Sequence, residues 1–460
     1  MKRRTTRDVK LRLQVLRGTK VLSSALILLA AIGVIVPPMV FSATALTVAD
    51  VRQRALEFNR TYLSAKEDVV KAQSQITTAR AGALPDITLA SSYNRNLKLP
   101  SFFVQPDSGQ AIEFRTGFNN DFSATLSVQQ SLWEGGKVFT ALSIAKLYKK
   151  YSLAKEAEVR STVIVNAEQL FYAAILQQSN LLALQKAFEA NSLNLDMVEK
   201  QYSQGVVSEF EVLRARVEKQ NLMPQIFKAE SDVKLARKKL QTYIGIELRE
   251  DVNLIEELGD TTLAALPPMQ ALVDTALEQR PEIQQLDYLT SITKKAVKVA
   301  RGDYYPKLKA VSSYNWSAQS DRLTLSEHNT RTWQAGLNLT IPIFKGGATR
   351  GSVTNSLADY RQTMLSAKQA RDNIRLEVED AYDQLIQAKK SLEVQGTTIA
   401  QAEEGLRIAN VRYQSGVGTL LEVLSAQSAL TQARNSLALA TYSFQVAKSQ
   451  LRKATTIDIN

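Results

Sequence analysis

The chain of 460 residues contains no cysteine and only one histidine, His328. Without cysteine, the protein can form neither disulfide bonds nor a thioether-linked lipid at a mature N-terminus. His328 is expected in a loop between two strands, where a solvated residue is more common than a metal ligand or a general base. The sequence also holds no cluster of metal-ligating residue types. It therefore predicts no catalytic residue, no metal site and no cofactor.

A strong positive charge is lacking outside the N-terminus. The net charge is +12, but residues 1–45 contain eight basic residues and one acid, Asp8. Seven of the twelve positive charges therefore lie in that segment, and the remaining chain carries +5. This distribution removes the main support for a nucleic-acid partner, because binding to phosphate backbones depends on basic surfaces of the folded protein.

The N-terminus has the pattern of a secretory signal peptide. A basic region reaches Lys20, an apolar run follows over residues 21–36, and Ala43-Thr44-Ala45 has the small residues of a cleavage site. We predict a signal peptide over residues 1–45 and a mature protein that begins at Leu46. The alternative is an uncleaved membrane anchor, but the sixteen apolar residues fall short of the roughly 20 that span a bilayer.

Two short stretches share one pattern, 211 positions apart. Residues 202–206 read Tyr-Ser-Gln-Gly-Val, and residues 413–417 read Tyr-Gln-Ser-Gly-Val. Gly205 and Gly416 suit the left-handed conformation that closes a helix. New helices are predicted to start directly afterwards, with capping boxes formed by the pairs Ser208 and Glu211, and Thr419 and Glu422. Each stretch is therefore predicted to be the tip of a helical hairpin.

Apolar residues flank both tips at alternating steps of three and four. In the first copy they include Leu181, Leu184, Phe188, Leu195, Val198, Val212, Ala215, Leu222, Ile226, Val233 and Leu240. An apolar period of about 3.5 residues is typical of left-handed coiled coils. At about 1.5 Å per residue, the uninterrupted pattern from Lys137 to Tyr202 predicts a rod of about 100 Å.

Between the helical segments, four stretches alternate with the period of a β-strand. They are residues 87–94, 122–129, 308–316 and 333–341. One face of each is apolar and the other carries small or polar residues, which suits membrane-spanning strands of roughly 9–11 residues. We predict two hairpins and hence four membrane strands per chain. The alternative is a small antiparallel sheet packed on a soluble core.

Aromatic residues lie near the strand ends, where an interfacial girdle is expected. They are Tyr93, Trp133, Trp316, Trp333 and Phe344. The pairs Gly135-Gly136 and Gly346-Gly347 are predicted to turn the chain from strand into long helix. Phosphate binding is the poorer interpretation, because neither pair is followed by the Lys-Ser/Thr of a phosphate-binding loop. Four strands cannot close a barrel and open edges are not tolerated in lipid, so the protein should oligomerise. Two chains would supply eight strands and three would supply twelve, and hollow coiled-coil walls favour the wider barrel.

The chain accordingly divides into two structural repeats. We assign residues 46–243 to the first repeat, which begins with a helical stretch over residues 47–80, and residues 271–455 to the second. Residues 244–270 form an acidic connecting segment, and residues 456–460 are the C-terminal end.

These motifs together resemble the TolC family of outer-membrane efflux proteins. The matching features are the doubled Tyr-x-x-Gly tips followed by Val-Leu-x-Ala, the run Arg280-Pro281-Glu282, the pair Tyr305-Pro306, and Pro342-Ile343-Phe344-x-Gly-Gly. The resemblance implies a mainly α fold with membrane β structure. In it, duplicated helical hairpins of three chains form a periplasmic α-barrel, joined to a 12-stranded outer-membrane β-barrel. Its implied partners are outer-membrane lipid, a periplasmic adaptor, and an inner-membrane pump or ABC transporter.

The resemblance also implies roles for residues at the tips. A periplasmic gate and its lumen would involve Tyr413, Gly418, Glu422 and Ser425, and an adaptor would dock on Gly205, Val206, Gly416 and Val417. Some relatives carry a basic residue where this chain has Gly418, so a salt bridge from that position is not expected. A second glycine beside Gly416 suggests that the second hairpin is the one that moves. Glu422 has two readings, an acidic ring in the lumen or only a helix cap.

Two other classes of protein have less support in the sequence. An enzyme lacks support for the reasons given above. A periplasmic coiled-coil adaptor without a membrane barrel would be expected to show one hairpin inside globular β-domains. The sequence therefore predicts a passive exit duct in the outer membrane, and it leaves open whether small molecules or secreted proteins pass through it.

Overall fold

The computed structural model describes residues 44–105, 109, 111–255, 266–325 and 328–457. The predicted signal peptide lies almost wholly outside these residues, as do Glu256 and Glu257 of the connecting segment. No helix among the described residues is both long enough and apolar enough to cross a membrane.

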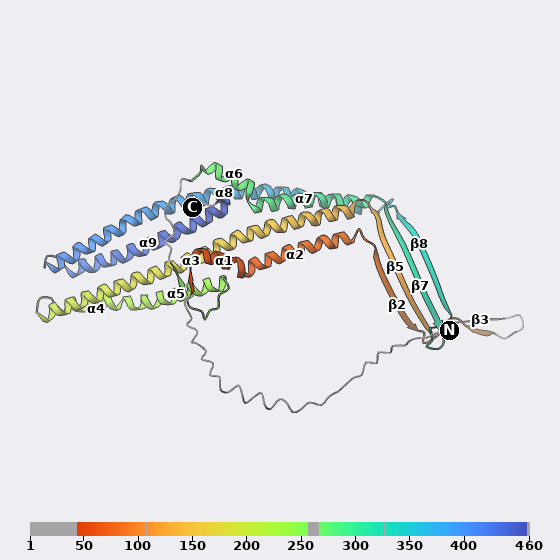
Figure 1. Ribbon diagram of the computed structural model, residues 1–460, viewed down its shortest axis with the longest axis horizontal. Coiled ribbons are helices and arrows are strands. Elements are labelled where there is room, and N and C mark those ends of the chain that lie inside the picture. Colours follow the sequence, from red (N-terminus) through yellow and green to blue (C-terminus); the bar gives the residue numbers. More distant parts are fainter. Residues whose placement is uncertain (1–43, 106–108, 110, 256–265, 326–327, 458–460) are drawn as a thin grey trace, which may run out of the picture.

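Two helices run the length of the molecule from a β-sheet to the tips (Figure 1). They are α3 (Lys137–Ser203) and α8 (Ala348–Gln414), each of 67 residues, and they confirm the predicted rods. Near the sheet the helices lie in the order α2, α3, α7, α8, and near the tips in the order α8, α9, α3, followed by α4 and α5. The bounds are α2 (Arg60–Ala81), α4 (Glu209–Gln220), α5 (Leu222–Tyr243), α7 (Pro281–Arg301) and α9 (Leu420–Thr455).

The sheet contains the four predicted strands in the order β2-β5-β7-β8, all antiparallel. The bounds are β2 (Asp86–Arg95), β5 (Asn120–Glu134), β7 (Lys307–Ser320) and β8 (Asn329–Thr340). The two predicted hairpins, one from each repeat, form one sheet because β5 pairs with β7. The register of this pair shifts between Ser131 and Trp133. Among the described residues, β2 and β8 each pair on one side only, so both edges of this sheet are open.

The strand register sorts side chains onto two different faces. Leu89, Leu126, Tyr314 and Trp333 are successive partners across the sheet and share one face. The other face is polar, since the Ser92 and Ser123 hydroxyls lie 2.8 Å apart and the hydroxyl of Thr125 donates to Asn315 Oδ1 at 2.9 Å. The predicted alternation is therefore present in the structure, with exposed apolar side chains such as Leu89, 73% exposed, on one face.

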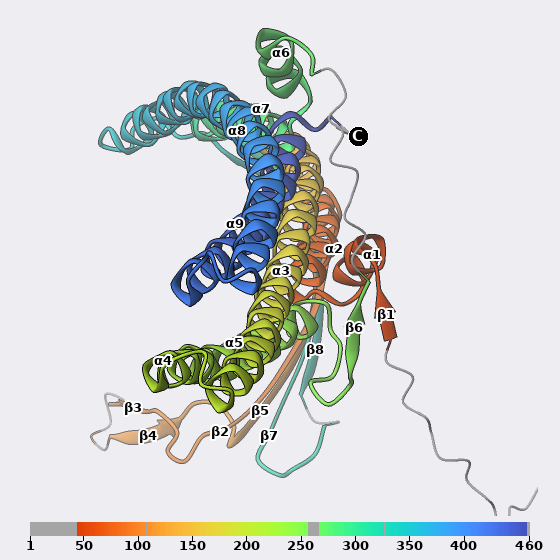
Figure 2. The same cartoon turned by 90° about the vertical axis from the view of Figure 1, so that its left-hand side faces the viewer.

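The long helices follow one arc when viewed from the tips (Figure 2). Short elements lie on its convex side, namely α1 (Val48–Phe58), α6 (Met269–Gln279), and a parallel pair of strands, β1 (Thr44–Leu46) and β6 (Val252–Leu254). This pair was not predicted. Cleavage before Leu46, which remains a prediction, would leave only that residue of β1 in the mature chain.

A buried carboxylate ties three of these elements together. Glu168 of α3 is fully buried and forms ion pairs with Arg52 of α1 and Arg452 of α9. A buried charge is costly unless it is paired and hydrogen-bonded, and here two guanidinium groups meet that requirement. The ion cluster fixes the end of α9 that lies far from the tip.

The structure adds three local features that the sequence analysis did not predict. The helical stretch over residues 47–80 is two helices, because the Asn59 side chain caps the second one by accepting from the backbone amides of Thr61 and Tyr62. The helix after the first tip breaks at Asn221, three residues before Pro224, whose ring has no N–H to donate to the preceding turn. The polar loop after β2 contains two short paired strands, β3 (Ser101–Val104) and β4 (Ile112–Arg115), with two phenylalanines stacked across the pair.

Between the last residues of α7 and β7 lies a short 3-10 helix, η1 (Gly302–Tyr304). It leads directly into Tyr305-Pro306, one of the motifs on which the family resemblance was based.

Candidate functional site: the paired hairpin tips

Both hairpin tips close as the sequence predicts. Gly205 has φ +74° and Gly416 has φ +75°, which is the left-handed region that glycine adopts without strain. The amide of Val206 then donates to Gln201 O at 2.9 Å, and that of Val417 donates to Arg412 O at 3.1 Å. The two turns are therefore equivalent, as the internal repeat requires.

The two tips also pack against each other through one apolar cluster. It contains Leu195, Val198, Val212 and Ala215 from the first hairpin and Ala409, Tyr413, Leu420, Val423 and Leu424 from the second. This contact between the repeats could not be read from the sequence, because each repeat predicts only its own hairpin.

Tyr413 links the hairpins by a polar contact. Its hydroxyl donates to Gln201 Oε1 at 2.9 Å, and the residue is only 8% exposed. Burial raises the pKa of Tyr413, and the nearby charge of Glu211 raises it further, so the hydroxyl is neutral at physiological pH. Tyr202, the matching residue of the first repeat, is 47% exposed instead. The repeat is symmetric in sequence, but only its second tyrosine joins the two hairpins.

The predicted capping box at the first tip does not form. Ser208 is the N-cap of α4, but its side chain makes no capping hydrogen bond. Glu211 is directed elsewhere, and its Oε2 atom is buried without a hydrogen-bond partner among the described residues. Glu211 is instead near Tyr413 of the other hairpin, where its charge contributes to the raised pKa of that tyrosine.

The second capping box forms only in part. The Thr419 hydroxyl accepts from the Glu422 amide at 3.3 Å, as predicted. The Glu422 carboxylate does not return to the Thr419 amide, because it accepts from Arg412 Nε at 3.4 Å. The side chain of Glu422 is thus not required for the cap. The basic residue that forms an ion pair at this tip is therefore Arg412, and not a residue at position 418.

Gly418 is held in a tight space. A Cβ atom at this position would lie 2.9 Å from Arg412 Cβ and 2.9 Å from the backbone nitrogen of Tyr413. Its amide donates to Arg412 O at 2.9 Å. The structural reason for glycine here is the close approach to the end of α8, which the sequence argument from flexibility did not recognise.

The other residues predicted at the tips are on the surface. Glu422 and Ser425 are exposed one turn apart on the same side of α9. Val206 and Val417 are 68% and 69% exposed at the two turns, beside Gly205 and Gly416. These tips therefore present apolar side chains to solvent in the single chain.

The aromatic residues predicted as a girdle occupy both ends of the sheet. Tyr93, Trp316 and Trp333 lie toward the ends of their strands that are far from the long helices, whereas Trp133 and Phe344 lie next to the helices. Trp333 is 77% exposed and Phe344 is 87% exposed. Trp333 also donates from Nε1 to the Ser312 hydroxyl at 3.0 Å.

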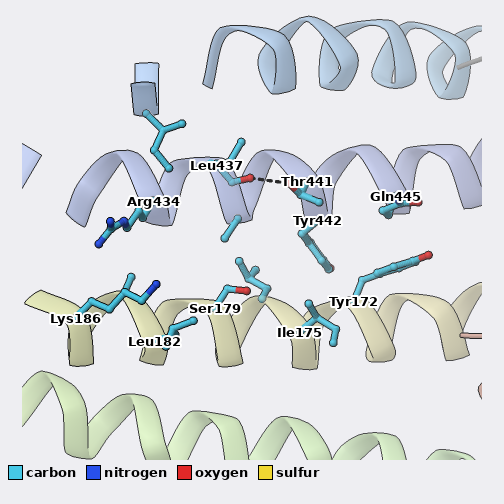
Figure 3. A pocket seen from close by; sticks show the side chains of 14 residues that line it. Tyr172, Ile175, Ser179, Leu182, Lys186, Arg434, Leu437, Thr441, Tyr442 and Gln445 are labelled. Atoms are coloured by element: carbon cyan, nitrogen blue, oxygen red, sulfur yellow. Dashed lines mark hydrogen bonds between the residues drawn. The ribbon is translucent and has the colours of Figure 1, made fainter. Parts of the chain in front are cut away.

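A groove of about 470 Å³ lies between α3 and α9, midway along the hairpins (Figure 3). Tyr172 and Tyr442 lie at one end, Lys186 and Arg434 lie at the other, and leucine and isoleucine side chains line the middle. The sequence analysis did not identify this groove, since its lining comes from helices of different repeats.

The chain shows no grouping for metal chemistry in its described part, where no three acidic or histidine side chains lie close enough together to hold an ion. His328, at φ +44°, stacks on Phe118 with ring centroids 4.6 Å apart.

Comparisons with known proteins agree with this architecture. Residues 51–246 and 272–456 match the family model described as outer membrane efflux protein. Nodulation protein T of Rhizobium leguminosarum bv. trifolii is 22% identical over 399 residues, covering 84% of this chain and 80% of that protein. The cation efflux system protein CusC of Escherichia coli O6:H1 is 24% identical over 408 residues, covering 87% and 84%. The alkaline protease secretion protein AprF of Pseudomonas aeruginosa is 22% identical over 416 residues, covering 89% and 84%.

Solved structures are similar over most of the chain. A crystal structure of CusC has a TM-score of 0.73 at 20% identity and covers 89% of this chain and 91% of that one. The outer membrane protein VceC of Vibrio cholerae has a TM-score of 0.72 at 18% identity and covers 89% and 95%. The resemblance first seen in the doubled tips is confirmed, and the family model spans both repeats. The chain belongs to the outer membrane efflux protein family.

Proposed function

We propose that the protein is a passive exit duct formed by three copies of this chain. Strands β2 and β8 are open edges, and the helices that continue from them, α2 and α8, lie at the corresponding edges of the helical layer. Because an open edge is not tolerated in lipid, β8 of one copy would pair with β2 of the next until the ring closes. Three copies supply twelve strands and a continuous helical tunnel.

The family match decides between the classes considered at the outset. The chain belongs to a family of outer-membrane channels, so it is neither an enzyme nor a periplasmic adaptor. The apolar face of the four-stranded sheet supports the same assignment, since its exposed leucine and tryptophan side chains suit a lipid environment.

In this proposal the paired tips are the gate at the periplasmic end of the duct. The observation that carries it is the hydrogen bond from Tyr413 to Gln201, a polar contact that joins the two hairpins at the tip beside their shared apolar cluster. Opening would require this contact to break. The exposed Val206 and Val417 turns would receive the adaptor, which in turn connects the duct to an inner-membrane pump or ABC transporter.

The names of the relatives do not identify which class of substrate passes through the duct. By their names, CusC belongs to a cation efflux system, AprF to alkaline protease secretion, and a protein of Pseudomonas putida, ArpC, to an antibiotic efflux pump. All three are about equally similar to this chain. A wide pore need not match its substrate closely, so one duct architecture is compatible with all of these cargoes.

Two measurements test the proposal. Light scattering of the purified protein in detergent should give a trimer, and a stable monomer with intact β-structure would contradict the shared barrel. In planar bilayers, the trimer should conduct without ATP or another energy source. A strain that lacks the protein should then accumulate dyes and antibiotics if small molecules are the cargo, or fail to secrete specific proteins if proteins are.

A further inference from the structure

Arg95 and Arg331 lie on the two edge strands of the sheet, β2 and β8. In the ladder of one chain, Arg95 is level with Asn120 and Ser320, whereas Arg331 is level with Trp316, four residues nearer the helices. Arg95 lies two residues beyond Tyr93 on β2, and Arg331 lies two residues before Trp333 on β8, whose direction is opposite. Residues two apart share a face, so each arginine is on the same face as its aromatic neighbour. Each also lies on the side of that neighbour that is farther from the helices.

This face is the apolar one. Tyr93 pairs with Phe122 and stacks on it at 4.8 Å, and Trp333 pairs with Tyr314 in the row that contains Leu126. In a protein that spans the outer membrane through this sheet, aromatic side chains on the lipid-facing surface mark the interface with water. Both guanidinium groups would then lie just outside that interface, on the external side, at the depth of lipid headgroups.

Neither arginine has an acidic partner in the described part of the chain. Both side chains are exposed, and no ion pair involves them. Two carboxylates near this end of the sheet bind asparagine side chains and neither arginine: Asp121 Oδ2 accepts from Asn96 Nδ2 at 2.7 Å, and Asp321 Oδ1 accepts from Asn119 Nδ2 at 3.0 Å.

The opposite end of the sheet differs in this respect. There, Lys307 is paired with Asp303 at 3.3 Å and Lys309 with Glu134 at 3.8 Å. The sheet thus places cations beside carboxylates at its helical end and leaves arginines without them at its outer end.

Closure of the sheet would bring the two arginines together. Within one chain, Arg95 and Arg331 lie on opposite edges of the sheet. In the proposed ring, β8 of one copy neighbours β2 of the next at about 4.8 Å, so Arg331 and the Arg95 of a second copy share one junction and one face. Two like charges at one junction, neither paired with a carboxylate among the described residues, favour the binding of an anion, and the planar guanidinium group matches phosphate oxygens well.

We propose that each junction between copies binds the phosphate group of an outer-leaflet lipid through Arg95 and Arg331, with Tyr93 and Trp333 contacting the adjoining part of that lipid. The inference rests on the proposed trimer, because the site is complete only where two copies meet. It assigns one lipid to each junction.

The test uses the purified trimer and diphosphorylated lipid A, with bound lipids counted by native mass spectrometry and affinity taken from thermal stabilisation. The variants are Arg95→Gln, Arg331→Gln and their combination. A matched control is Arg361→Gln, an exposed arginine of α8 that has no ion pair among the described residues. Each single variant should weaken binding about tenfold, as expected for one charge-assisted hydrogen bond, and the control should bind normally.

Several outcomes separate this proposal from its alternatives. One lipid per subunit, with the affinity of every junction lowered in either single variant, supports a shared site. Two classes of site, of which a single variant weakens only one, would contradict it. Lipid A without phosphates should bind poorly, and equal binding would overturn the phosphate contact. Inorganic phosphate that stabilises as well as the lipid would overturn the lipid assignment.

Two further checks keep the result interpretable. If the glutamine variants do not assemble, the Arg95→Lys and Arg331→Lys pair retains the charges and should still bind phosphorylated lipid. A wild-type protein that is monomeric would refute the proposed function itself, whereas a trimer that binds no phosphorylated lipid would refute only this site.

Discussion

The contact between Tyr413 and Gln201 allows a quantitative test of the gate. In Tyr413→Phe, the ring keeps its place in the apolar cluster and only the hydroxyl is lost. A neutral hydrogen bond of this kind contributes about 1 kcal/mol net. If opening breaks this hydrogen bond in all three copies, the variant shifts the free-energy difference between the closed and open states by about 3 kcal/mol. The ratio of open to closed channels then rises roughly a hundredfold. Single-channel recording in planar bilayers would show this as a longer or more frequent high-conductance state.

The internal repeat provides the control for this experiment. Tyr202→Phe makes the same change at the matching position, where the residue is exposed and no described residue hydrogen-bonds to its hydroxyl. It should leave conductance unchanged. Tyr413→Phe should also add little in a Gln201→Leu background, since the partner is then already absent. Equal conductance of the Tyr413 and Tyr202 variants would refute the argument.

The pH dependence follows from the direction of the pKa shift. The pKa of Tyr413 is raised in the folded protein, first by burial and then by Glu211. The neutral hydroxyl is therefore favoured, and its contribution is fully present below the ordinary tyrosine pKa of about 10 and lost as the pH rises through the folded value. Conductance should be flat between about pH 6 and 9 in the wild type, apart from other groups, and the rise above about pH 10 should be smaller in Tyr413→Phe.

Three further predictions concern single side chains. Gly418→Val should lower the melting temperature and disturb the second tip, because its Cβ would come within 2.9 Å of backbone and side-chain atoms. Val207→Gly should have a smaller effect, and similar melting temperatures of the two variants would contradict the close-packing argument. Glu422→Gln should change stability by less than about 1 kcal/mol, since the ion pair of Glu422 is exposed. If Glu422 faces the lumen, the same variant should lower cation selectivity in bilayer recordings. Unchanged selectivity, together with a destabilised Glu422→Ala, would leave Glu422 only a structural role. Glu168→Leu should destabilise the protein by about 1–3 kcal/mol, because two partly exposed arginines lose their shared partner. Denaturant unfolding that shows no loss would contradict the role of the ion cluster.

The sequence predicted those parts of the fold that depend on local patterns. The 3.5-residue period located α3 over its full length and the later part of α8, and the two-residue period located the four strands and their faces. Gly205 and Gly416 identified the turns because few residues other than glycine adopt their φ values. Each of these features is decided within a few turns or one hairpin, so no knowledge of distant contacts was needed.

Contacts between the repeats were beyond such patterns. Glu211 and Glu422 match the capping-box spacing, yet one lies toward Tyr413 and the other pairs with Arg412. Both outcomes depend on which side chains of the other helix are within reach. Glu168 likewise reads as one charge among many on a long helix until α1 and α9 bring arginines to it.

The sequence did contain one signal for the site that was not used. The two copies of the tip motif differ in the residue directly before the tyrosine. It is Gln201 in the first copy and Arg412 in the second. Arg412 could have been proposed as the basic residue of this tip on that ground. Its partner could not, because the carboxylate lies across the turn.

The break at Asn221 makes the two hairpins mechanically unequal. In the first hairpin the returning chain is two helices, of 12 and 22 residues, with Pro224 just beyond the joint, whereas the second returns as one helix of 36 residues. Asn221 itself keeps helical dihedrals, but Pro224 has no N–H to donate to the preceding turn, so the returning chain of the first hairpin is expected to be less stiff here than α9. A force applied at the second tip should therefore travel along α9 to its anchored end at Arg452, while a similar force at the first tip is absorbed near Asn221. The second hairpin is thus expected to behave as a lever and the first as a compliant support.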